Sequence, residues 1–142
     1  MMHPEQARLD LVRQWLLKAA EDFQAVEYLC AAEAPLYGVI GFHCQQCIEK
    51  LLKAWLTWRS IEFRKTHDIV ELLDLVASQD AKLAGLLENT AVLSHYAVAT
   101  RYPGDIPMLS KAEATAAVQL TTTARQVIFN SLPEHVFPLP PC

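Results

Sequence analysis

The sequence has no long apolar run, no excess of positive charge and no leader-like N-terminus. None of its apolar runs approaches the roughly 18 residues that a membrane-spanning helix needs. The net charge is −4, which argues against broad, sequence-independent nucleic-acid binding, because such binding relies on many Lys and Arg against phosphate. A local basic groove is compatible with this charge.

The first ten residues, MMHPEQARLD, lack the basic and apolar segments of a signal peptide. We therefore expect a cytoplasmic protein whose four cysteines stay reduced. Hydrophobic residues make up 52% of the chain and charged residues 20%, which is an ordinary globular balance. A chain of 142 residues fits one domain, and its core needs no disulfide or metal to compensate for small size.

No segment shows the alternation of a strand, and the apolar spacing predicts helices instead. The first predicted helix contains no Gly and no Pro after Pro4, and its apolar residues recur at spacings of three and four. We expect Thr66 to N-cap the third helix, and Ser110 with Glu113 to form a capping box on the last. The predicted helices span residues 4–33, 36–59, 66–79, 80–100 and 110–131.

These helices predict an all-α fold, an antiparallel up-and-down bundle of four to five helices with short connections. The fourth should place Leu83, Leu86, Leu87, Leu93 and Tyr96 in the core. We expect the bundle to occupy residues 1–132 as a single domain. The proline-rich residues 133–142 form a C-terminal tail that is ordered only through contacts.

The stretch FHCQQCIEKLLKAWL raises the question of whether Cys44 and Cys47 bind a metal or pack in the core. On a helical projection both fall on the same side as Leu51 and Trp55. Zinc sites built on C-x-x-C usually have a second Cys or His pair, whereas the remaining cysteines lie at a helix end and at the terminus. We therefore expect buried thiols, and neither a metal site nor a cofactor.

The same helix has a polar side that contains His43, Gln46, Lys50 and Lys53. A solvated stripe is the simplest interpretation of these residues, and a ligand-binding groove is the alternative. Periodicity alone does not separate the two.

Four segments, in this order along the chain, resemble the HEPN family of small helical domains. Residue 47 is Cys where Ala is common in the family, and residue 69 is Ile in place of Leu. No single segment is diagnostic, but four in the right order cover most of the chain. The segments are KAAEDFQAVEYL (18–29), YGVIGFHCQQCIEKLLKAWL (37–56), FRKTHDIVELL (63–73) and YAVATRYPGD (96–105).

The resemblance implies a helical bundle, often a homodimer, of the kind paired with a minimal nucleotidyltransferase, as in toxin–antitoxin pairs. Some members are metal-independent ribonucleases that use Arg and His separated by four to six residues. That motif is absent here: Arg59 precedes His67 by seven intervening residues and Arg64 precedes it by two. We therefore name no catalytic residue, although a general base and an Arg from separate segments stay possible.

Nine polar residues match the family pattern. In one interpretation, Lys50 and Arg101 contact phosphate while Tyr102 or His43 contacts a base or ribose. In the other, Asp22 accepts from Arg101, and His67 and Asp68 organise the turn before the third helix. Our candidate ligand-binding residues are Asp22, His43, Gln46, Lys50, Arg101 and Tyr102, and the other three matches are Lys65, His67 and Asp68.

Three functions follow as alternatives: a nucleotide- or RNA-binding module paired with a nucleotidyltransferase, a divergent ribonuclease toxin, and a structural dimer partner. We expect a twofold dimer in each case. Phe42 and Leu56 lie off the main apolar side of the second helix, and Trp15 and Leu17 flank that of the first. A helix that is apolar over much of its girth needs neighbours on more than one side.

Overall fold

Helices make up most of the chain in the computed structural model, which describes residues 3–99 and 108–138. No strand occurs in these ranges, so the predicted all-α bundle is confirmed. Among the described helices, none is both long and apolar enough to cross a membrane. The elements are α1 (Pro4–Ala31), α2 (Tyr37–Trp58), α3 (Ile69–Ala77), α4 (Ala81–Leu87), the 3-10 helix η1 (Glu88–Leu93), α5 (Ser94–Ala99), α6 (Lys111–Asn130) and the 3-10 helix η2 (Glu134–Val136).

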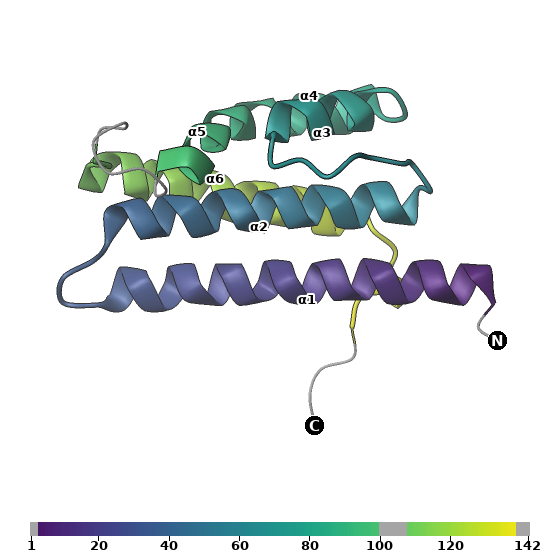
Figure 1. The fold of residues 1–142 in the computed structure, drawn as a ribbon, viewed down its shortest axis with the longest axis horizontal. Coiled ribbons are helices and arrows are strands. Elements are labelled where there is room, and N and C mark those ends of the chain that lie inside the picture. The colour runs from purple at the N-terminus through teal and green to yellow at the C-terminus, as the bar shows by residue number, and fades with distance from the viewer. Residues whose placement is uncertain (1–2, 100–107, 139–142) are drawn as a thin grey trace.

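Helix α2 is the centre of the bundle. It runs antiparallel to α1, and it also contacts α3, α5 and α6 (Figure 1). Leu56 is completely buried within this one chain, and Phe42 is half-buried. A helix that is apolar on nearly every side belongs inside a core. Neighbouring helices of the same chain cover Leu56, so its place off the main apolar side of α2 does not support the predicted dimer.

The predicted fourth helix is broken into α4, η1 and α5. The break falls at the run Glu88-Asn89-Thr90, where the Thr90 hydroxyl donates to the Leu87 carbonyl at 2.6 Å. Hydroxyl side chains that bond the nearby backbone compete with regular helix. The predicted core position Leu86 is consequently wrong and lies exposed, whereas Leu83, Leu87 and Leu93 are buried as predicted.

Asp68, and not Thr66, caps the third helix. Its carboxylate accepts from the Val70 N–H at 2.9 Å, while the Thr66 hydroxyl accepts from the Asp68 N–H at 3.1 Å. The N-cap therefore lies two residues later than predicted, and the helix begins at Ile69. The capping box predicted for the last helix is confirmed: the Ser110 and Glu113 side chains each accept from the other's N–H at 3.1 Å.

Residues 133–138 of the tail pack against the bundle. Val136 is fully buried, and the Phe137 ring packs edge-on against Phe129 with centroids 5.2 Å apart. Arg13 on α1 donates to the His135 carbonyl at 2.8 Å. These contacts tie the chain beyond α6 to both α6 and α1.

Candidate functional site

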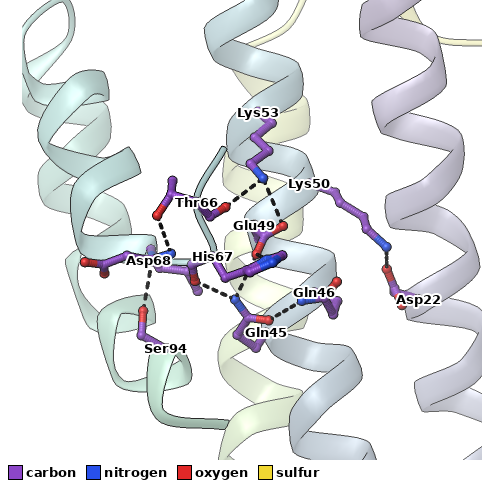
Figure 2. A network of polar contacts seen from close by, with 11 residues as sticks. Asp22, Gln45, Gln46, Glu49, Lys50, Lys53, Thr66, His67, Asp68 and Ser94 are labelled. Carbon is purple, nitrogen blue, oxygen red and sulfur yellow. Dashed lines mark hydrogen bonds and ion pairs between the residues drawn. The ribbon is translucent and has the colours of Figure 1, made fainter. Parts of the chain in front are cut away.

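Asp22 on α1 contacts two of the predicted ligand-binding residues of α2. Its carboxylate is only 10% exposed, so its charge needs close partners. One oxygen accepts from His43 Nδ1 at 2.8 Å, and the other from Lys50 Nζ at 2.5 Å. Figure 2 shows Lys50 reaching from α2 across to Asp22. The structure therefore brings Asp22, His43 and Lys50 together in a single cluster.

A second carboxylate, Glu49, has the same arrangement and was not predicted from the sequence. It is 3% exposed. One oxygen accepts from His67 Nδ1 at 2.7 Å and the other from Lys53 Nζ at 3.1 Å. Lys53 also donates to the Thr66 carbonyl at 2.8 Å, and Gln45 Nε2 donates to the His67 carbonyl at 3.0 Å (Figure 2). These bonds fasten the segment before α3 to α2.

The two clusters share one chemical design. In each, a lysine neutralises a carboxylate whose other oxygen holds a histidine at Nδ1. Because a carboxylate can only accept, each ring carries a hydrogen on Nδ1 and presents Nε2 away from the carboxylate. Within the described part of the chain, neither His43 nor His67 has a hydrogen-bond partner at Nε2.

The two clusters form one continuous band, which we call the polar stripe. Its α2 members lie within about one third of the helix circumference, at 100° per residue. Figure 2 shows Gln46, Glu49, Lys50 and Lys53 of this band on α2, between Asp22 on α1 and the segment before α3. The polar stripe consists of Asp22, His43, Gln46, Glu49, Lys50, Lys53 and His67.

The remaining predicted residues are placed as follows. Gln46 is half-buried, and its amide donates to Gln45 Oε1 at 2.7 Å. Lys65 is exposed, and Asp68 caps α3. Arg101 and Tyr102 lie outside the described residues, so the proposed Arg101–Asp22 contact stays a prediction.

The sequence profile of the HEPN domain matches residues 12–130 of this chain. The chain belongs to the HEPN family. A search of curated proteins and a search of solved structures each found no match. Every residue of the polar stripe lies inside the matched range, so both carboxylate clusters are part of the HEPN domain.

The sequence did not predict that this HEPN domain buries a row of three polar side chains on α2. Gln45, Glu49 and Lys53 follow one another at i, i+4, and such spacing is typical of helix side chains that interact. All three are buried. Polar residues with this spacing usually lie on an exposed face, so the spacing alone does not predict their burial.

The Lys53 side chain is enclosed by neighbouring residues, so little of its surface can contact a ligand. Its side chain is 7% exposed. Its ammonium lies 5.4 Å from the centroid of the Trp15 ring and 5.9 Å from that of Phe63. Aromatic faces attract a cation, and more strongly where water is excluded. Lys53 therefore locks α1, α2 and the segment before α3 together.

The cysteines of α2 lie in the core, as predicted. Cys44 and Cys47 are fully buried. Burial raises the pKa of Cys44 to about 11 and that of Cys47 to about 12. Among the described residues, no group of three or more His, Cys, Asp or Glu is placed to hold a metal ion.

We predict that Cys30 reacts with a thiol-modifying reagent while Cys44 and Cys47 do not. A raised thiol pKa leaves almost no thiolate at about pH 8, where an ordinary thiol is partly ionised. Cys30 is exposed at the end of α1. Iodoacetamide labelling of the native protein, read by peptide mass spectrometry, should modify Cys30 alone of these three. Rapid native labelling of Cys47 would contradict the prediction, and denaturant should expose all three.

Proposed function

We propose that this HEPN domain is a nucleotide- and RNA-binding module that works as the partner of a minimal nucleotidyltransferase in a toxin–antitoxin-like pair. Membership of the HEPN family supports a nucleotide- or RNA-related role. The observation that carries the proposal is the cluster of Asp22, His43 and Lys50 on the partly exposed side of α2.

The chemistry of this cluster suits a phosphate-bearing ligand. The Lys50 side chain keeps 21% of its surface exposed, so its ammonium can contact a phosphate oxygen without leaving Asp22. His43 is 28% exposed and offers a polar ring beside it. The basic group is local, which agrees with the overall net charge of −4. A single nucleotide or a short single strand therefore fits better than a long duplex.

The test is titration of ATP, GTP and a short single-stranded RNA into the protein, with Lys50→Met as the variant. Methionine retains most of the aliphatic stem but removes the charge. Losing a charge-assisted hydrogen bond should weaken binding about tenfold or more. Lys82→Met is the matched control, because Lys82 is exposed on α4, outside the polar stripe. Equal affinity of the parent and Lys50→Met would reject this site.

Incubation of the same RNA with the protein tests the two alternative functions, a ribonuclease and a structural partner. RNA incubated with the pure protein should stay intact, since the sequence lacks the Arg–His spacing of the family's ribonucleases. Cleavage that disappears in His43→Ala would favour the divergent ribonuclease. Absence of both binding and cleavage would favour a structural partner.

The partner assignment has its own test. A minimal nucleotidyltransferase encoded beside this protein should form a stable complex with it on co-expression, as seen by size-exclusion chromatography.

We include a homodimer and a cytoplasmic setting in the proposal. Exposed Leu17 and Tyr28, eleven residues apart on α1, support a second contact surface, and the three described cysteines are free thiols. A scattering mass of 15.9 kDa would exclude the dimer.

A further inference from the structure

His67 combines high exposure with a fixed orientation. Its side chain is 62% exposed, yet its Nδ1 lies 2.7 Å from Glu49, a carboxylate that is 3% exposed. The turn that carries His67 is already attached through its backbone, because Gln45 donates to the His67 carbonyl and Lys53 to the Thr66 carbonyl. Because these two backbone contacts already attach the turn, the ring bond to Glu49 has a second effect, which is to fix the direction of the exposed edge of the ring.

The orientation gives His67 a defined hydrogen-bonding role. Glu49 can only accept, so His67 Nδ1 carries a hydrogen, and in the neutral form of the ring Nε2 carries a lone pair. Nε2 has no partner among the described residues. In that form it suits an O–H or N–H donor of a ligand, and not a phosphate, which only accepts.

Lys50 supplies the complementary group. It follows Glu49 directly in α2, and Figure 2 shows it extending toward α1, while His67 lies beside Glu49 on the segment before α3. A ligand that meets both side chains must present an anion to Lys50 and a donor to His67. Ribonucleotides carry both groups a few atoms apart, since their ribose hydroxyls donate and their phosphates accept.

We propose that His67 Nε2 accepts a hydrogen bond from a ribose hydroxyl of the bound ribonucleotide, and that Glu49 is the residue that positions His67. The inference rests on the proposed nucleotide binding and adds the sugar to it. The ribose is favoured over the base because its hydroxyls lie closer to the phosphate that Lys50 would contact. The domain should therefore discriminate ribonucleotides from deoxyribonucleotides.

The experiment compares the affinities of ATP, 2′-deoxy-ATP and 3′-deoxy-ATP for the full chain by calorimetric titration. The parent should bind ATP about three- to tenfold more tightly than at least one deoxy form, which corresponds to one neutral hydrogen bond. His67→Asn keeps an amide N–H near the Nδ1 position, so it can still bond Glu49, but it lacks the Nε2 acceptor. It should lose the preference while its affinity for the deoxy form stays unchanged.

Two further variants separate this role from a structural one. His67→Gln places an amide oxygen near the Nε2 position and should restore part of the preference. His135→Asn is the matched control, because His135 is an exposed histidine of η2 outside the polar stripe, and it should keep the full preference. Each readout is a ratio of affinities within one variant, so a general loss of stability does not mimic it.

The outcomes distinguish the inference from the function it rests on. Equal binding of ATP and both deoxy forms by the parent would overturn the inference and leave nucleotide binding intact. A preference that survives His67→Asn, or that disappears in His135→Asn, would overturn it as well. Discrimination between ATP and ITP without discrimination against the deoxy forms would assign Nε2 to the base. If no nucleotide binds, the proposed function and this inference both fail.

Discussion

Glu49→Gln is expected to lower the free energy of unfolding by about 3–5 kcal/mol, which is the usual cost of removing one partner from a buried ion pair. Glutamine has nearly the same shape as glutamate, so packing around residue 49 changes little. Lys53, however, stays 7% exposed and loses its counterion. The Thr66 carbonyl and two aromatic rings then remain as its described partners. Urea denaturation followed by circular dichroism measures the loss.

The double variant Glu49→Gln/Lys53→Met tests the cause. It removes both buried charges, so most of the lost stability should return, because replacing a buried pair with uncharged groups of similar volume is often close to neutral. Glu62→Gln is the matched single control, since Glu62 is exposed, and it should change stability by less than about 0.5 kcal/mol. A Glu49→Gln protein as stable as the parent would show that the pair contributes no net stability.

Leu56→Ala should cost about 2–5 kcal/mol, the range for truncating a fully buried leucine. Leu56 is 0% exposed at the C-terminal end of the central helix, so its truncation leaves a cavity lined by other core residues. Leu17→Ala is the control. Leu17 is 51% exposed on α1, and its truncation should cost less than about 0.5 kcal/mol in the monomer.

Measuring the unfolding of Leu56→Ala at low and at high protein concentration distinguishes a contact within one chain from a contact between two subunits. Loss of a core contact within one chain lowers stability by the same amount at both concentrations. If Leu56 lay between two subunits, the variant would shift the concentration dependence of unfolding, because dimer stability depends on protomer concentration. Such a shift would restore the intersubunit contact that the fold argues against.

The exposed side of the polar stripe could largely be predicted from the sequence, and its buried side could not. His43, Gln46 and Lys50 share one side of a predicted helix, and helical geometry alone places them together. Their partner Asp22 lies on another helix, and only the antiparallel packing of α1 on α2 determines which residues reach it. Glu49 was not singled out from the sequence, because its i, i+4 spacing to Lys53 is equally typical of an exposed pair.

The sequence by itself determined the features that depend on neighbours a few residues away. These are the helical character of the segments, the core-facing side of α2 that buries Cys44 and Cys47, and the Ser110–Glu113 capping box. Each follows from a periodicity or a hydrogen bond that spans one or two turns.

The tertiary structure decided which of several locally acceptable choices prevails. Thr66 could have capped α3, but its carbonyl accepts from Lys53, and Asp68 caps the helix two residues later. Leu56 lies off the main apolar side of α2, and only the packing of the other helices around α2 shows that the same chain buries it. Burial depends on which distant segments cover a side chain, and that information is spread over the whole chain and absent from any one helix.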